Sequence, residues 1–144
     1  METHLFYLDE ESILREHVFR DSDDTGFSGS LGAHNITPAG DTQLASYWPF
    51  LAYQNSDKTF SEARYNCTTS GINCWNSENL KVAGPGPSTA LAMVPTGRNM
   101  NGTFLLYQRE DGDLVNSQWE NSTNTWSSST SPFSVLPPPL TGIQ

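Results

Sequence analysis

The chain has 144 residues, and its seven basic against sixteen acidic side chains give a formal net charge of −9. This charge excludes the usual nucleic-acid binder, which needs basic residues to neutralise phosphates, and a protein that docks on anionic lipid. The sequence contains no apolar run long enough to span a membrane, and residues 1–20 contain no apolar segment typical of a secretory signal. We expect one domain, 1–144, with a hydrophobic core of its own.

Turn-forming residues separate short aromatic and aliphatic runs along the whole chain, which contains 11 glycines and 9 prolines. A helical protein would be richer in Ala, Glu, Lys and Leu, and a disordered chain would have fewer aromatic residues than the 11 % found here. Many short apolar runs between turns predict an all-β fold.

The first stretch, 1–48, predicts two strands at 4–7 and 13–19, joined by a polar turn at 9–12. Phe27 follows in a polar stretch, and another strand is expected at 43–48. The acidic run at 21–26 starts like a calcium-binding loop, but Gly32 stands where that loop needs its closing glutamate. We therefore predict a solvated turn there and no metal site.

The second stretch, 49–94, repeats this order with strands at 50–54 and 60–65 around a turn at 55–59. Trp75 follows in polar surroundings, and a further strand is expected at 89–94. Between these elements, Cys67 and Cys74 lie close enough in sequence to close a small loop. A disulfide there is typical of an oxidising compartment, and two free, partly buried thiols are the alternative.

The third stretch, 95–144, predicts strands at 104–108 and 114–119. The turn between them, 109–113, contains Gly112, which readily adopts the positive φ of a tight turn. Trp126 follows, and residues 140–144 after a proline run resemble another strand.

These three stretches are copies of one unit. Tyr7, Tyr53 and Tyr107 hold the same place in each, at offsets of 46 and 54 residues, so we expect them in the core together with Trp48. Trp75 and Trp126 lie in polar stretches after the second strand of their units, so they are the aromatic residues that we consider for ligand binding. A unit of four antiparallel strands with this period predicts a β-propeller blade, whereas a β-sandwich would show no constant offset.

Three blades do not close a ring, because propellers have four to eight. The chain begins at the second strand of a blade and ends on what resembles a first strand, at 140–144. That last strand could complete the first blade of another copy, so that a homodimer closes six blades. The alternative is that the chain is a fragment of a longer propeller.

Four short pieces recur in a pattern of L-A-x-x-W, Y-Q and I-x-R-E. They are LASYW at 44–48, YQ at 53–54 and 107–108, and ILREH at 13–17. Together they resemble the fungal fucose-binding lectins of the Aleuria aurantia type. This resemblance implies a six-bladed propeller longer than this chain, which binds fucose between adjacent blades with no metal or other cofactor. The resemblance implies that each site combines an Arg, a Glu twelve residues on, and a Trp of the next blade.

The same positions in this chain give three expected sites. For each site we name the residue at the Arg position, the residue at the Glu position and the aromatic residue of the next blade. The first is His4, Glu16 and Trp75, and the second is Phe50, Glu62 and Trp126. The third is Phe104, Asn116 and, through whatever closes the ring, Phe27. The Arg is replaced in all three, which removes a charge-assisted hydrogen bond to sugar hydroxyls. In the second site, Arg64 could take over part of this role. The third site loses most of its polar groups.

The sequence therefore predicts a lectin for fucose or another neutral sugar, with His4, Glu16, Trp75, Glu62, Arg64 and Trp126 as its carbohydrate-binding residues. The alternative is a propeller scaffold or protein-interaction module that has lost sugar binding. An enzyme is not expected, because Glu16 and Glu62 lie in different blades, too far apart for a glycosidase carboxylate pair.

The compartment signals conflict. Four N-x-[ST] sequons, a feature that matters in secreted glycoproteins, begin at Asn35, Asn66, Asn101 and Asn121. These sequons and the cysteine pair indicate an extracellular or secreted protein, whereas residues 1–20 carry no signal segment.

Overall fold

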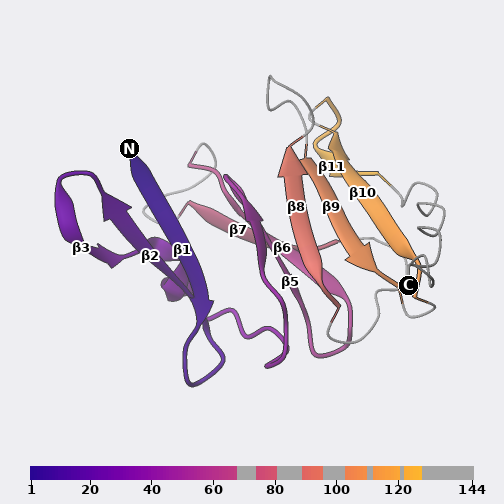
Figure 1. The fold of residues 1–144 in the computed structure, drawn as a ribbon, viewed down its shortest axis with the longest axis horizontal. Helices are drawn as coiled ribbons and strands as arrows, with labels where there is room; N and C mark the ends of the chain where they lie inside the picture. Colours follow the sequence, from indigo (N-terminus) through magenta and orange to yellow (C-terminus); the bar gives the residue numbers. More distant parts are fainter. Residues whose placement is uncertain (68–73, 81–88, 96–102, 110–111, 121, 128–144) are drawn as a thin grey trace, which may run out of the picture.

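The computed structural model describes residues 1–67, 74–80, 89–95, 103–109, 112–120 and 122–127. Its strands form three antiparallel sheets of three, four and four strands, which follow one another in chain order (Figure 1). The expected all-β fold of antiparallel blades is confirmed. The final strand expected at 140–144 lies outside the described residues. The described part of the chain contains no helix long and apolar enough to cross a membrane.

The first sheet has the strand order β1 (Glu2–Leu8), β2 (Leu14–Arg20) and β3 (Asp23–Ser28), and the 3-10 helix η1 (Ser30–His34) follows it. The turn between β1 and β2 is organised by Asp9. Its carboxylate accepts hydrogen bonds from the Ile13 N–H at 2.8 Å and from Arg15 Nε at 2.7 Å. These two donors hold the pKa of Asp9 below its usual range. The turn thereby sets the register in which Phe6 pairs with Glu16.

The second sheet has the order β4 (Ala45–Tyr47), β5 (Phe50–Gln54), β6 (Phe60–Tyr65) and β7 (Trp75–Leu80). The third has the order β8 (Leu91–Pro95), β9 (Thr103–Gln108), β10 (Leu114–Glu120) and β11 (Thr125–Trp126), with β8 and β11 at its edges. Each of these sheets takes its first strand from the end of the preceding sequence repeat. In the first sheet, no described strand pairs with the outer edge of β1.

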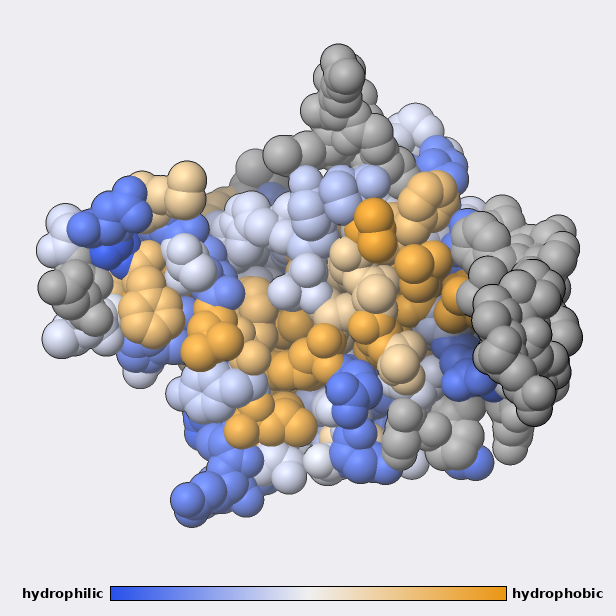
Figure 2. Space-filling model, viewed as in Figure 1, coloured by the Kyte–Doolittle hydropathy of each residue, from blue (hydrophilic) through white to orange (hydrophobic). Residues whose placement is uncertain are grey.

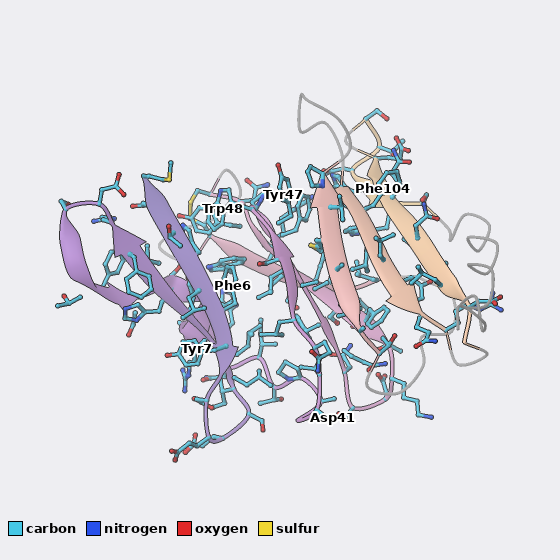
Figure 3. The ribbon with its side chains drawn as sticks, in the orientation of Figure 1. Phe6, Tyr7, Asp41, Tyr47, Trp48 and Phe104 are labelled. Carbon is cyan, nitrogen blue, oxygen red and sulfur yellow. A yellow bond between two sulfur atoms is a disulfide. The ribbon has the colours of Figure 1, made fainter. Side chains whose placement is uncertain are left out.

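Side chains alternate between the two faces of each strand, and this alternation gives every sheet two distinct faces. We call the face of a sheet that is turned toward the preceding sheet its leading face, and the opposite face its trailing face. In the second sheet, for example, Leu51 and Tyr53 lie on the leading face. Phe6 and Tyr7 project to opposite sides of β1 (Figure 3), so Phe6 lies on the trailing face and Tyr7 on the leading face.

The core consists of two clusters, each between a trailing face and the next leading face. The cluster between the first and second sheets contains Leu14, Leu31, Leu51, Tyr53, Ala63 and Trp75. The cluster between the second and third sheets contains Ala52, Phe60, Leu80, Leu105, Tyr107 and Val115. Each of the larger side chains contributes about 1.5–3 kcal/mol through burial. Hydrophobic residues gather toward the middle of the view in Figure 2, and hydrophilic ones lie at its left and lower margins.

The recurrent tyrosines occupy equivalent positions with different burial. Tyr53 and Tyr107 are buried in the core, as expected, and the Tyr53 hydroxyl hydrogen-bonds Ser77 Oγ at 2.7 Å. The expectation was wrong for Tyr7, whose side chain is exposed. The reason is that Tyr7 lies on the leading face of the first sheet, and none of the described residues forms a sheet in front of that face.

Candidate functional site

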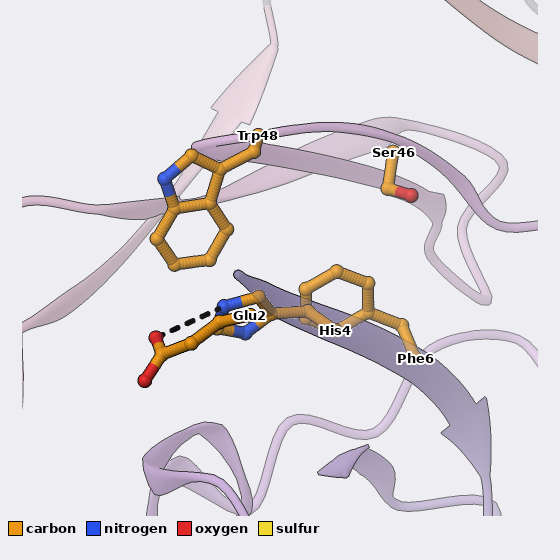
Figure 4. A pocket seen from close by; sticks show the side chains of 5 residues that line it. All are labelled: Glu2, His4, Phe6, Ser46 and Trp48. Atoms are coloured by element: carbon orange, nitrogen blue, oxygen red, sulfur yellow. Dashed lines mark ion pairs between the residues drawn. The ribbon is translucent and has the colours of Figure 1, made fainter. Parts of the chain in front are cut away.

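A hollow opens between the first and second sheets, where β1 faces the turn after β4. It has a volume of about 360 Å³ and is lined by Glu2, His4, Phe6, Ser46 and Trp48 (Figure 4). A second hollow of about 380 Å³ shares Glu2, His4 and Trp48 and extends along β2 and β3 past Glu16, Phe27 and Tyr65. We refer to the two together as the first pocket.

His4 and Glu16 form the polar centre of the first pocket. They lie on the trailing face of neighbouring strands, and His4 Nδ1 is 2.8 Å from Glu16 Oε1. The other carboxylate oxygen of Glu16 accepts the Leu31 N–H at 3.2 Å. Because the carboxylate only accepts, the hydrogen lies on His4 Nδ1. Nε2 of the same ring is 3.8 Å from Glu2 Oε2. His4 and Glu16, which the sequence assigned to one site, are therefore in contact in the structure.

Trp48 supplies the aromatic surface of this pocket. Its ring stacks on His4 with centroids 4.1 Å apart and 27° between the planes, and its side chain is 44 % exposed. The expectation of a core residue was wrong, because Trp48 lies in the turn between β4 and β5 and belongs to neither sheet face. Pro49, directly after it, is a turn signal that could have indicated this place.

Trp75, the aromatic residue that the sequence assigned to this site, lies deeper. It pairs with Tyr65 on the leading face of the second sheet and is only 3 % exposed. Its ring meets Trp48 edge-on at 6.0 Å and Phe6 at 5.8 Å. Trp75 therefore packs beneath the pocket and supports Trp48 from the core.

A second, smaller pocket of about 200 Å³ lies between the second and third sheets. It is lined by Glu78, Asn79, Leu80, Trp119, Asn124, Thr125 and Trp126. Two of the predicted residues meet beside it, because Trp126 Nε1 donates a hydrogen bond of 2.8 Å to Glu62 Oε2. Trp119, Asn124 and Glu78 were not expected from the sequence. Of these, Trp119 stands 54 residues after Tyr65, the offset between the second and third repeats, so the repeat could have indicated that it lies at an equivalent place.

Arg64 reaches across to the third sheet at this second pocket. Its guanidinium lies 4.9 Å from the Trp119 ring centroid, and Nη1 donates to Asn124 Oδ1 at 3.1 Å. Phe50, at the position of His4, is buried against Trp119 and Trp126, with ring centroids 5.3 and 6.2 Å away. At this position the second site therefore has apolar packing where the first site has a hydrogen-bonding ring.

Glu62 has an unusual environment for a carboxyl group. It is fully buried, and this burial raises its pKa to about 7, against the opposing hydrogen bond from Trp126. Glu78, directly opposite on β7, adds to the rise, and Arg64 counteracts it. At neutral pH, Glu62 is therefore divided between its charged and neutral forms.

We expect Glu62 to make folding pH-dependent. Between its usual pKa of 4.5 and the folded value of about 7, the folded protein holds a proton that the unfolded chain has released. Stability therefore falls as pH rises through this window and is level above it. Glu62→Gln keeps an acceptor for Trp126 and removes the charge, so it should be more stable than wild type at pH 8 by on the order of 1–3 kcal/mol. Urea unfolding at pH 4 and pH 8 measures the difference.

The exposed Glu10→Gln serves as the matched control, which should be as stable as wild type at each of the two pH values. A Glu62→Gln protein with the pH dependence of wild type would contradict the assignment.

The third expected site is not assembled within the chain. Phe104 and Asn116 lie on the trailing face of the third sheet, while Phe27 pairs with Val18 on the trailing face of the first and lines the first pocket. The expectation that Phe27 faces Phe104 and Asn116 was wrong, because strand register turns it toward the second sheet. Its ring lies 4.6 Å below the Arg20 guanidinium.

Cys67 and Cys74 are joined by a disulfide, the pairing that their spacing in sequence indicated. It lies between β6 and β7, beside the strand that begins with Trp75. Within the described ranges, no group of three or more His, Cys, Asp or Glu side chains is placed to hold a metal ion.

Comparison with known proteins gives matches in structure alone. No family model matches the chain, and no curated protein does. A triple arginine-to-alanine mutant of AofleA from Arthrobotrys oligospora matches with a TM-score of 0.76 and 20 % identity over 94 % of this chain and 41 % of that one. The fucose-specific lectin from Aleuria aurantia matches with a TM-score of 0.72 and 18 % identity over 94 % of this chain and 44 % of that one.

The structure of SapL1 lectin in complex with alpha methyl fucoside also matches, with a TM-score of 0.71 and 18 % identity over 90 % of this chain and 42 % of that one. The chain thus spans about two fifths of the length of these structures. At such low identity the likeness is one of fold, and it confirms the Aleuria-type propeller architecture that the sequence motifs indicated.

Proposed function

We propose that this chain is a secreted carbohydrate-binding lectin without catalytic activity, which takes fucose or another neutral sugar in its pockets between sheets. The observation that carries the proposal is the first pocket, where a half-exposed indole stands beside a histidine and a buried carboxylate. A sugar ring has apolar C–H faces and a rim of hydroxyls. The Trp48 face suits the former, and His4 with Glu16 suits the latter.

The fold neighbours support this proposal through their own descriptions, a fucose-specific lectin and a lectin in complex with alpha methyl fucoside. The disulfide supports an oxidising, extracellular location. We propose further that the chain works as a homodimer, with glycan as its partner.

Titration of the purified chain with methyl fucoside, together with a glycan array, tests the proposal. Saturable binding of fucose or another neutral sugar is the expected result. Folded protein that binds no glycan in either assay would refute it, and would favour the second candidate, a propeller scaffold that binds another protein. The replacement of the expected Arg by Phe50 and Phe104 is the observation that favours this second candidate.

Gly29 offers a specific test of the polar centre. A Cβ at this position would overlap the Glu16 carboxylate, whose place beside His4 it would therefore disturb. We expect Gly29→Ala to weaken sugar binding in the first pocket about tenfold, the loss of one charge-assisted hydrogen bond. Calorimetric titration measures it. In the matched control, Gly40→Ala, the added Cβ meets only Ser12 Oγ at 3.6 Å, an ordinary contact, and affinity should be unchanged. Equal affinities of the two variants would contradict the role of Glu16.

A further inference from the structure

The first and third sheets each have one outer face, and we call these the two end faces. They carry apolar residues whose equivalents in the other repeats lie in the interior. The leading end face, on the first sheet, carries Leu5, Tyr7, His17 and Phe19. The trailing end face, on the third sheet, carries Val94, Phe104, Leu106, Leu114 and Asn116. Each face has a counterpart inside the molecule, and the comparison shows what each is built to contact.

On the leading end face, Leu5 corresponds by the repeat offsets to Leu51 and Leu105. Leu5 is 52 % exposed, whereas both counterparts are completely buried against the preceding sheet. Tyr7 is 41 % exposed, and its counterparts in the second and third sheets are at most 3 % exposed. The first sheet therefore presents the same contact surface as the other two, without a sheet in front of it among the described residues.

On the trailing end face, Leu114 corresponds to Leu14 and Phe60. Leu114 is 47 % exposed, and both counterparts are completely buried against the following sheet. The third sheet thus presents the surface that the first and second sheets use to hold their successors.

We propose that the leading end face of one chain packs on the trailing end face of a second copy of this chain. Inside the molecule, the counterparts of Leu5 and Leu114 meet in one cluster at both interfaces, as Leu51 does with Leu14. The third sheet repeats this, since Leu105 and Phe60 share the other cluster. The two end faces are therefore complementary in the way that the internal faces are.

The number of copies follows from closure. A head-to-tail contact of two different faces generates a ring when the rotation closes, and propeller rings contain four to eight sheets. Each chain contributes the three sheets of its described residues, so two copies give six sheets, a number in this range.

The pairing would also complete the third pocket, a step that rests on the proposed sugar binding. Phe19 corresponds to Tyr65 and Trp119, which line the first and second pockets from the following sheet. In the pair, Phe19 of the second copy faces Phe104 and Asn116. The ligand would there meet an amide in place of the carboxylates of the other two sites.

Sedimentation over a concentration series tests the interface without sugar. The wild-type chain should have a mass near twice 15.9 kDa. Leu5→Glu and Leu114→Lys each spoil one face with a buried charge, so each variant alone should be monomeric. An equal mixture of the two should pair again, because one contact is wild type and the other joins Glu to Lys. Restored pairing also shows that both variants are folded.

Glu10→Lys, at an exposed turn away from both faces, is the control and should pair as wild type does. A wild-type monomer at every concentration, an open series of larger assemblies, single variants that still pair, or a mixture that stays monomeric would each overturn the proposal. A pair that binds no glycan refutes the lectin function alone, and a monomer that binds glycan refutes the pairing alone.

Discussion

Replacing Trp48 with alanine should weaken sugar binding in the first pocket about thirtyfold while the fold remains intact. Trp48 is half-exposed and stacks on His4, so its ring is the largest apolar surface open to a ligand there. Loss of a central aromatic contact in a binding site costs about 2 kcal/mol, which corresponds to this factor in affinity. Titration calorimetry with methyl fucoside measures the loss, and thermal unfolding verifies the fold.

Two further variants separate stacking from packing. Trp48→Phe keeps an aromatic face and should keep most of the affinity. Trp75→Ala removes a buried ring beneath the pocket, so its main effect should be a loss of stability of about 3–5 kcal/mol. If Trp48→Ala bound sugar as wild type does while Trp75→Ala remained stable and lost binding, the assignment that the sequence suggested would be right and ours would be wrong.

Replacing Phe60 with alanine should destabilise the protein by about 3–5 kcal/mol, the range for truncation of a large core residue. Phe60 is completely buried between the second and third sheets, and its ring meets Tyr107 edge-on at 5.1 Å. The surrounding residues are held by strand hydrogen bonds in two sheets and cannot easily close the cavity. Urea unfolding gives the difference in free energy.

The half-exposed Phe27 provides the control, because Phe27→Ala removes the same atoms from a site open to solvent. Its cost should be below about 1 kcal/mol. Equal costs for Phe27→Ala and Phe60→Ala would show that the second and third sheets do not share a packed core.

Much of the candidate site was accessible from the sequence, because strand periodicity and the repeat offset are local properties. Alternation in β1 and β2, with a short turn between them, is enough to bring His4 and Glu16 to one face. In the second repeat, the family resemblance had put Glu62 and Trp126 in one site, and the two side chains are hydrogen-bonded in the structure. Spacing could not show the burial of Glu62, since burial depends on what the third sheet places over it.

The burial of the aromatic residues could not be predicted from their neighbours in the sequence. Trp48 lies in the turn after β4, and Trp75 is the first residue of β7. Apart from the turn signal of Pro49, the sequence around them does not show which of the two a neighbouring sheet covers. The turn at Pro49 leaves Trp48 exposed, while pairing with Tyr65 turns Trp75 into the core. Phe27 was misplaced for a related reason: its register with Val18, next to an irregularity in β2, decides its face.

Most of the strands, their alternation and the three-fold repeat could be predicted from the sequence, because turns and side-chain periodicity act between residues close along the chain. The strands β3, β7 and β11 were not expected, and the covering of each repeated residue depends on how the sheets pack. Tyr7, Tyr53 and Tyr107 are the same residue in the same local setting, yet the first is exposed and the others are buried. The physical reason is that burial depends on the sheet packed in front, a contact between residues that lie far apart in the sequence.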